Sequence, residues 1–552
     1  PTLRNHFASN ETSLLPYLRG LSGVRAHVRV LVPALMHAIR GVAGMHARGY
    51  VVGDMSPRNF LVDPGSGRVV QRVGIAQREQ HVRADGEDWG PLREDWYGLA
   101  KCFAHAPLSL ENIVGLGGCD DAALVERLCF AAGLPQGLCA ALQNLLAGDW
   151  QAALAACEQL MEAMRSRPGV SKRLADAMRP ATANAGRAAL DAERMIAGLR
   201  HGLQEDYRGP QAIRVWPGDP AGYAFSKWGL AYGAAGVALA LTRAGGDAPS
   251  GLAEALAEEA AHCPVTAGLF YGAAGMASAL GQLGEPARAA ERLAGLAIGD
   301  LAQCTGISSG FAGVGLAALV HWERFGTAPA LELAMAMGGR LRETVQFTAE
   351  GLAYWQVDGR KRDIYLGYQH GVAGIAYFLC RLGVAAARRD LIALGEQAIA
   401  YLYGTAATDA NGCLRWSRSP GGLSWLPYLG DGAAGIGAVL LRLGHLLDRE
   451  DLVQDAIDLG QSAFSNFSVN GGQLYGLAGI GEFMVDLREA TGLPKFAWLA
   501  DEVFASLQTY VAARGEGIRA AGTSSLRLSC DFATGAAGLL HADVDDCGGV
   551  AG

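Results

Sequence analysis

The sequence predicts a mainly α-helical protein whose larger part is a closed ring of seven helical hairpins. One motif, an aromatic or polar residue followed by Gly-x-x-Gly and a run of small apolar residues, occurs seven times. The apolar runs are rich in Ala and Leu, which favour helices, and they lack the alternation of a strand. The spacings of 38 to 61 residues leave room for two helices per unit. The first glycines are Gly233, Gly272, Gly310, Gly371, Gly432, Gly476 and Gly535.

A helix that is apolar nearly all round must be buried on most sides, so each repeat helix needs an outer partner. Seven such pairs suggest a ring, although the repeat alone also permits an open solenoid. The first glycine of each motif can take a positive φ in the turn that enters the helix. The second glycine should allow backbones to approach closely.

Composition narrows the class of protein. The chain has 552 residues, half of them hydrophobic, and its net charge of −8 offers no basic surface for nucleic acid. No run reaches the roughly 18 uninterrupted apolar residues of a membrane span, and no signal peptide is apparent, so we expect no membrane partner. Eleven cysteines without CxxC pairs indicate a reducing, cytoplasmic environment.

The first 180 residues follow a different pattern. A helix is expected from about Val28 to Arg48, followed by a turn that carries Asp54 and by a hairpin formed from FLVD and RVV. Asn59 lies five residues after Asp54, and Asp95 lies in a second helical segment. This order resembles the C-lobe of protein kinases, in which such an aspartate accepts the substrate hydroxyl proton and the asparagine binds metal.

The kinase resemblance is partial. No Gly-rich phosphate loop or strand lysine precedes the first helix, and no Asp-Phe-Gly segment lies between Leu61 and Asp95. Two interpretations stay open: this part is a pseudokinase, or the sequence lacks segments of the kinase. We expect a kinase-like domain at residues 1–180 and a ring domain at 181–552.

The combination of both parts resembles the lanthipeptide synthetases that fuse lyase, kinase and LanC-like cyclase. The resemblance implies that residues 181–552 form a seven-repeat α,α-toroid, with the lyase and the kinase N-lobe upstream of Pro1. It implies a kinase that uses ATP or GTP with Mg to phosphorylate Ser and Thr of a precursor peptide. The lyase then forms dehydroamino acids, and the cyclase adds Cys thiols to them.

The resemblance also bears on zinc. Zinc-dependent LanC cyclases carry Trp-Cys-Tyr-Gly before the fifth turn and Cys-His-Gly before the sixth. Gly430, Leu474 and Tyr475 stand at the three ligand positions here, and none can replace a Cys/Cys/His set. The sequence therefore predicts no zinc, as in class III synthetases, which make lanthionine or labionin.

Candidate site residues come from the position before each first glycine, because converging turns would place these side chains in one cavity. His370 is the member that titrates near neutrality, and it matches a histidine of the zinc cyclases, so it is the expected thiol base. Asp431 could orient this imidazole, bind peptide or cap a helix. Tyr232, Tyr271 and Tyr475 are expected to line the wall and contact substrate. The set is Tyr232, Tyr271, Ser309, His370, Asp431, Tyr475 and Thr534.

The leading functional hypothesis is a peptide Ser/Thr kinase joined to a zinc-free thioether cyclase, with Asp54, Asn59 and His370 as catalytic residues. A second hypothesis makes the ring a non-catalytic scaffold that presents the peptide to the kinase and lyase. A third, a carbohydrate-active helical barrel, would need two carboxylates across the cavity, and the ring supplies only Asp431. Whether the chain forms a homo-oligomer stays open.

Overall fold

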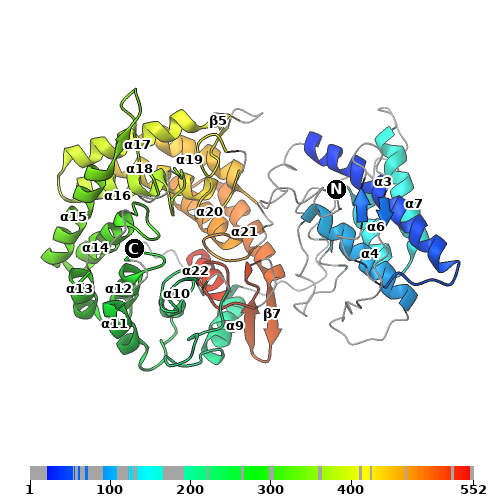
Figure 1. The fold of residues 1–552 in the computed structure, drawn as a ribbon, viewed down its shortest axis with the longest axis horizontal. Helices are drawn as coiled ribbons and strands as arrows, with labels where there is room; N and C mark the ends of the chain where they lie inside the picture. Colours follow the sequence, from blue (N-terminus) through cyan, green and yellow to red (C-terminus); the bar gives the residue numbers. More distant parts are fainter. Residues whose placement is uncertain are drawn as a thin grey trace. The chain divides into compact units, whose positions relative to one another are not determined.

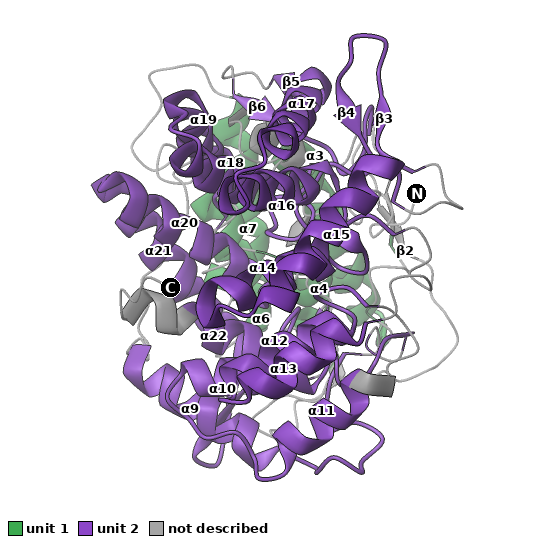
Figure 2. Ribbon diagram, turned by 90° about the vertical axis from the view of Figure 1, so that its left-hand side faces the viewer, with its two compact units in different colours: residues 1–189, 466–469 green, residues 190–465, 470–552 purple. Residues whose placement is uncertain are grey.

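A computed structural model describes most of residues 21–547. The gaps are 54, 56–59, 63–68, 72–90, 109–121, 123–124, 127–128, 130–133, 166–191, 220–221, 223, 263–266, 297–303, 358–362, 409–412, 423–424, 466–467, 469 and 524–527. The chain forms two compact units, shown separately coloured in Figure 2. Unit 1 holds residues 1–189 and 466–469, and unit 2 holds residues 190–465 and 470–552. The division thus falls at 189/190, whereas the sequence suggested 180/181.

Unit 1 is built from helices and one hairpin. Helix α3 packs against α4 and α7, and α6 packs against both α4 and α7. Strands β1 and β2 pair antiparallel with Phe60 opposite Gln71, which confirms the predicted hairpin. Phe60 is fully buried and meets Phe103 edge to face. The elements are α3 (Leu21–His46), β1 (Phe60–Val62), β2 (Val69–Gln71), α4 (Pro91–Leu108), α6 (Gln136–Leu146) and α7 (Trp150–Arg165).

Helix α3 is an exception to the expectation about membrane spans. Its segment Val28–His46 is long and apolar enough to cross a bilayer by length and mean hydropathy alone. Core helices of water-soluble folds meet the same criteria, and the buried positions of α3, such as Leu31, Leu35 and Ile39, are consistent with packing inside the unit.

Unit 2 is a closed ring. Seven described inner helices each contact the next, and α22 contacts α10, so the circle is complete (Figure 1). This contact excludes the open solenoid. The inner helices are α10 (Ala234–Arg243), α12 (Ala273–Gln282), α14 (Phe311–Phe325), α16 (Val372–Ala385), α18 (Ala433–Leu446), α20 (Leu477–Thr491) and α22 (Ala536–Cys547).

An outer layer of described helices covers the inner ring, as the apolar character of the inner helices requires. Most outer helices follow their inner partner in sequence, as α15 follows α14 and α17 follows α16. The last inner helix, α22, packs instead against α9 from the start of the unit. The outer helices are α9 (Ala192–Glu205), α11 (Leu252–His262), α13 (Pro286–Ala294), α15 (Ala328–Thr344), α17 (Arg389–Thr405), α19 (Glu450–Ala463) and α21 (Pro494–Leu507).

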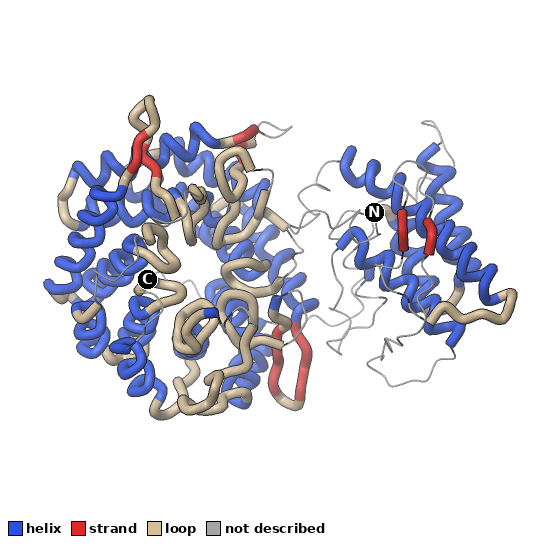
Figure 3. Tube along the Cα trace, viewed as in Figure 1, coloured by secondary structure: helices blue, strands red, loops and turns tan. Residues whose placement is uncertain are grey.

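Short hairpins follow three outer helices, and the turns that enter the inner helices gather toward the middle of the ring (Figure 3). A 3-10 turn, Gln508–Tyr510, precedes the last hairpin. The strands are β3 (Gln346–Phe347), β4 (Ala353–Tyr354), β5 (Ala407–Thr408), β6 (Leu414–Arg415), β7 (Val511–Arg514) and β8 (Gly517–Ala520).

Glycine is required at the motif positions because neighbouring atoms leave no room for a Cβ. The first glycine does not use the positive φ that was open to it: Gly371, for example, caps α16 with φ −121° and ψ −169°, which is extended backbone. A Cβ there would lie 2.4 Å from the carbonyl of Tyr365. The second glycine does allow close approach, as expected, because a Cβ at Gly374 would lie 1.9 Å from the carbonyl oxygen of Tyr368.

Candidate functional site

A continuous circuit of backbone hydrogen bonds joins the seven turns. In each turn, the carbonyl of the residue two before the first glycine accepts an N–H from the preceding turn, at 2.8 to 3.1 Å. Six of these N–H groups come from the equivalent position, and Tyr271 supplies the seventh. The circuit holds the turns in fixed register. The accepting residues are Ala231, Phe270, Ser308, Gln369, Gly430, Leu474 and Ala533.

The next residue in each turn is the position from which the sequence analysis drew its site candidates. The structure brings several of them together around Tyr271. The Tyr271 and Tyr475 hydroxyl oxygens lie 3.4 Å apart, and the Tyr232 ring stacks on the Tyr271 ring with centroids 6.1 Å apart. The His370 ring centroid lies 5.9 Å from that of Tyr271. We call Tyr232, Tyr271, His370, Asp431 and Tyr475 the mouth residues.

Two candidates of the same ring stand apart. The Thr534 hydroxyl donates to Asp531 Oδ1 at 3.0 Å, and the Thr534 N–H donates to the same oxygen at 2.8 Å. Burial raises the pKa of Asp531, which also accepts the N–H of Asp219 at 3.0 Å. Thr534 therefore serves the packing of the seventh turn. No described contact links Ser309 to the mouth residues.

His370 is half-buried, and its surroundings favour the neutral form of its imidazole. Burial lowers the pKa of His370; Asp431 acts to raise that pKa and Arg418 to lower it. Tyr365 meets the imidazole edge to face with ring centroids 6.3 Å apart. A neutral imidazole can accept a proton, which is the first requirement for a thiol base.

Asp431 is buried, and its carboxylate faces a cation. Its Oδ2 lies 3.5 Å from Arg418 Nη2, while Oδ1 has no hydrogen-bond partner among the described residues. Arg418 in turn lies over the Tyr365 ring at 4.5 Å. Of the roles expected for Asp431, these contacts favour an electrostatic one beside His370 over capping of α18, whose N-cap is Gly432.

Sequence reasoning missed Gln369, which is fully buried directly before His370. Its Nε2 donates to Tyr271 Oη at 3.0 Å, and its Oε1 has no partner among the described residues. It missed Arg418 as well, which reaches the site from a segment far from any Gly-x-x-Gly turn. The available signal for Gln369 was its place in the motif, next to the histidine.

The three positions that correspond to zinc ligands in the resembling family do not fit a metal. A glycine, a leucine and a phenol offer no thiolate or imidazole there. A Cβ on Gly430 would lie 2.8 Å from Gln369 Oε1 and 2.9 Å from the Leu474 carbonyl oxygen, so this side-chain space is already filled. Across the described part of the chain, no group of three His, Cys, Asp or Glu residues is placed to hold a metal ion.

The candidate kinase residues Asp54 and Asn59 lie outside the described residues. Their surroundings are described in part. Asp95 is buried in α4 and accepts the N–H groups of Val52 and Gly53 at 2.7 and 2.8 Å. His46 Nε2 lies 2.9 Å from Asp95 Oδ2. Asp95 thus fastens the backbone immediately before position 54.

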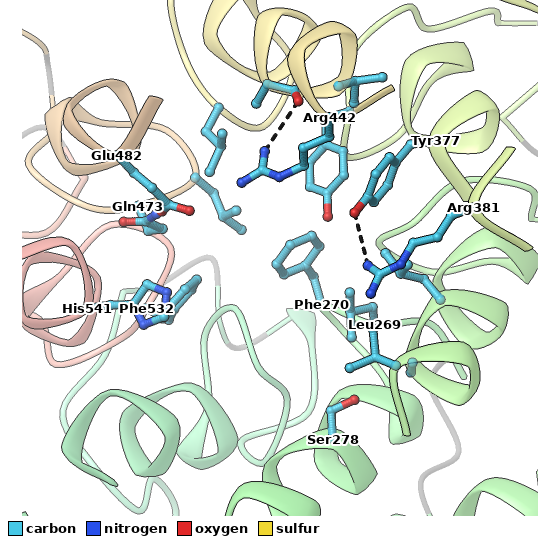
Figure 4. A pocket seen from close by; sticks show the side chains of 18 residues that line it. Leu269, Phe270, Ser278, Tyr377, Arg381, Arg442, Gln473, Glu482, Phe532 and His541 are labelled. Carbon is cyan, nitrogen blue, oxygen red and sulfur yellow. Dashed lines mark hydrogen bonds between the residues drawn. The ribbon is translucent and has the colours of Figure 1, made fainter. Parts of the chain in front are cut away.

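A cavity in the ring is lined by other side chains than the mouth residues. It has a volume of about 320 Å³ and is lined by residues of the inner helices and of the turns that enter them, and none of the seven candidate side chains lines it. Figure 4 shows Tyr377, Arg381, Arg442, Glu482 and His541 pointing into it from α16, α18, α20 and α22. The mouth is the better candidate site, because two cations that line this cavity already have carboxylate partners: Arg442 pairs with Asp486 at 2.8 Å, and Arg381 pairs with Glu323.

Comparison with known proteins identifies one family and several structures with limited similarity. Residues 227–542 match the family described as "Lanthionine synthetase C-like protein", which is more than half of the chain. The structure titled "Nisin cyclase" is similar with a TM-score of 0.40 and 14% identity, over 58% of this chain and 86% of that chain. The Lin0763 protein from Listeria innocua has a TM-score of 0.40 and 12% identity, over 64% and 96%. A sugar epimerase from a ruminal bacterium has a TM-score of 0.38 and 11% identity, over 65% and 100%. No curated protein matches the sequence.

Proposed function

Since the chain belongs to the lanthionine synthetase C-like family, we propose that its ring domain is a zinc-free cyclase that closes thioether rings in a precursor peptide. Family membership supports thioether-forming cyclase activity. The observation that carries the zinc-free form is His370, a half-buried imidazole with a lowered pKa, beside Asp431 and Tyr271. A free thiol has a pKa near 8.5, so its sulfur needs a base at neutral pH.

The proposed reaction is a conjugate addition. His370 accepts the proton of the peptide Cys thiol, and the sulfur forms a bond to Cβ of dehydroalanine or dehydrobutyrine. The π electrons of the Cα–Cβ double bond move toward the adjacent carbonyl, whose oxygen becomes an enolate. His370 then returns its proton to Cα, so the thiol has been added across the double bond and the enzyme is restored.

We propose further that unit 1 belongs to a kinase that phosphorylates Ser and Thr of the same peptide, with Asp54 as proton acceptor and Asn59 as metal ligand. Supporting this, Asp95 binds the backbone N–H groups of Val52 and Gly53, just before Asp54. ATP or GTP with Mg would supply the phosphoryl group. An associated lyase would eliminate phosphate, and the products would be lanthionine or labionin, as in class III synthetases.

The cyclase proposal is tested with a synthetic peptide that carries one dehydroalanine and one cysteine, incubated with the full chain. Loss of the free thiol is followed by alkylation and mass spectrometry. We expect His370→Ala to slow ring closure roughly 100-fold, the range of a general base. His445→Ala is the control, because His445 is exposed on α18 and should leave the rate unchanged.

Two results would contradict the proposal. Ring closure at full speed by His370→Ala would remove this residue from the mechanism. A wild-type protein that closes rings no faster than buffer would favour the scaffold function instead. A metal chelator added to the pre-dehydrated peptide should leave the rate unaffected, and a chelator-sensitive rate would show that a metal takes part.

A further inference from the structure

The proposed cyclase reaction places negative charge on an enolate oxygen, and His370 alone does not neutralise it. The mouth holds two phenols suited to that task. The hydroxyl oxygens of Tyr271 and Tyr475 lie 3.4 Å apart, from the second and sixth turns, which the backbone circuit holds in place. Such fixed donors stabilise developing charge best when they are aimed before the reaction begins.

Gln369 determines which way the Tyr271 proton points. Its Nε2 carries only donors, so Tyr271 Oη must accept in their 3.0 Å hydrogen bond. The Tyr271 hydroxyl also interacts with the Ser308 side chain, and its proton can point toward Tyr475 or toward a bound group. An acceptor at this place would instead draw the phenol proton away from the mouth.

The position of Gln369 is strongly restrained. Its backbone N–H donates to Gly430 at 2.8 Å, and its carbonyl accepts from Ser308 at 2.9 Å. Its carboxamide occupies space that a side chain at position 430 would take, because a Cβ there would come within 2.8 Å of Oε1. Phe225 stacks on the Tyr271 ring at 4.1 Å and limits its tilt.

We infer that Tyr271 and Tyr475 form an oxyanion-binding pair for the enolate oxygen, and that Gln369 is the positioning residue that directs the Tyr271 proton. This inference rests on the proposed cyclase function. The phenols donate hydrogen bonds and keep their protons, so the proton balance of the addition is unchanged. Burial raises the pKa of both tyrosines, so they stay neutral donors while the enolate forms.

The pair and the base are neighbours. The ring centroids of Tyr271 and His370 are 5.9 Å apart, so a substrate bound at the edge of this ring contact would reach the donor pair and the imidazole together. Such placement would present one face of the enolate to the proton on His370. The pair therefore contributes to the stereochemistry of Cα as well as to the rate.

The test uses the full chain and the synthetic dehydroalanine–cysteine peptide. We expect Tyr475→Phe and Tyr271→Phe each to lower kcat roughly 100- to 1,000-fold, as removal of an oxyanion donor does. KM should change little, because the ground-state carbonyl carries little charge. Gln369→Met, which keeps the length but removes the donor, should lower kcat about 10-fold. Tyr354→Phe removes a phenol from β4, away from the mouth, and should have no effect.

A second readout separates positioning from mere structural support. The ratio of lanthionine diastereomers, resolved by chiral gas chromatography after hydrolysis, should shift in the Tyr271, Tyr475 and Gln369 variants toward the ratio of the uncatalysed reaction. Folded variants that retain wild-type kcat and a single diastereomer would overturn the inference while leaving the cyclase proposal intact. A wild-type protein that fails to accelerate ring closure would overturn both. If a phenylalanine variant does not fold, Gln369→Met decides the question by the same two measurements.

Discussion

The backbone N–H of Ala533 donates a 2.8 Å hydrogen bond to the carbonyl oxygen of Ala231 and so joins the seventh turn to the first. The same junction is held on the outside of the ring by Arg519, which reaches Asp206 at 3.1 Å and Glu205 at 2.8 Å. Both ends of unit 2 therefore meet at one seam. The register of every turn, and with it the mouth, depends on this closure.

The close approach at the second motif glycine predicts a large loss of stability on Gly374→Ala. The new Cβ would lie 1.9 Å from the Tyr368 carbonyl oxygen, which only a backbone shift can relieve. We expect the free energy of unfolding to fall by about 2–4 kcal/mol, as for other strained core substitutions. Gly339→Ala in α15 is the matched control, because its Cβ meets nothing within 4 Å. That control should stabilise by about 0.5–1 kcal/mol. Equal urea midpoints for the two variants would contradict the prediction.

The charges beside His370 predict opposite changes in the pH profile of ring closure. The base must be neutral, so the rate falls as pH drops through the pKa of His370, which burial holds below its ordinary value. Asp431 acts to raise this pKa and Arg418 to lower it. Asp431→Asn should therefore move the acid limb to lower pH, and Arg418→Met should move it to higher pH. The measurement is kcat for the pre-dehydrated peptide against pH. Shifts of the same sign in both variants would contradict this assignment.

The buried His541 is expected to lower the stability of the fold as the pH falls. Its Nε2 contacts Arg243 Nη1 at 3.1 Å, and burial together with Arg243 lowers the pKa of His541 to about 3. Since the folded pKa lies below the unfolded value near 6.5, the unfolded chain binds the extra proton as pH falls. This group should reduce the free energy of unfolding by about 1.4 kcal/mol per pH unit below pH 6.5.

His541→Gln removes this titration while keeping an oxygen acceptor for Arg243. Urea unfolding at pH 7 and pH 5 should show a smaller difference for this variant than for the wild type. His445→Gln, at an exposed position of α18, is the control and should keep the wild-type difference. A slope for His541→Gln that equals the wild-type slope would mean that other groups cause the acid sensitivity.

Substitution of Asp95 is expected to reduce the proposed kinase activity selectively. The carboxylate of Asp95 accepts from Val52, Gly53 and His46, and an asparagine offers one acceptor oxygen and an opposing NH₂ group. Asp95→Asn should therefore loosen the backbone before Asp54 and lower precursor phosphorylation at least about 10-fold, with ring closure unchanged. Glu94→Gln, at an exposed neighbour, is the control. Undiminished phosphorylation by Asp95→Asn, followed by mass spectrometry, would contradict the role.

Much of the fold was predictable because its determinants are local and repeated. The Gly-x-x-Gly spacing and the apolar runs mark every inner helix, and the close approach at Gly374 follows from the absence of a side chain. The hairpin Phe60–Gln71 was predictable for the same local reason. The extended backbone at Gly371 was not, because its need for glycine comes from the Tyr365 carbonyl in the folded turn.

The number of repeats, and the position before each first glycine as the source of site residues, could be read from the sequence, since both follow from a period along one chain. Closure of the ring, and which of those residues meet, depended on the folded structure. Tyr271 and Tyr475 come from separate turns, and the Gln369 side chain, from a third turn, donates a hydrogen bond to Tyr271. Arg418 reaches Asp431 from outside the motif. Such contacts depend on how the ring closes in three dimensions, and no spacing within one turn encodes them.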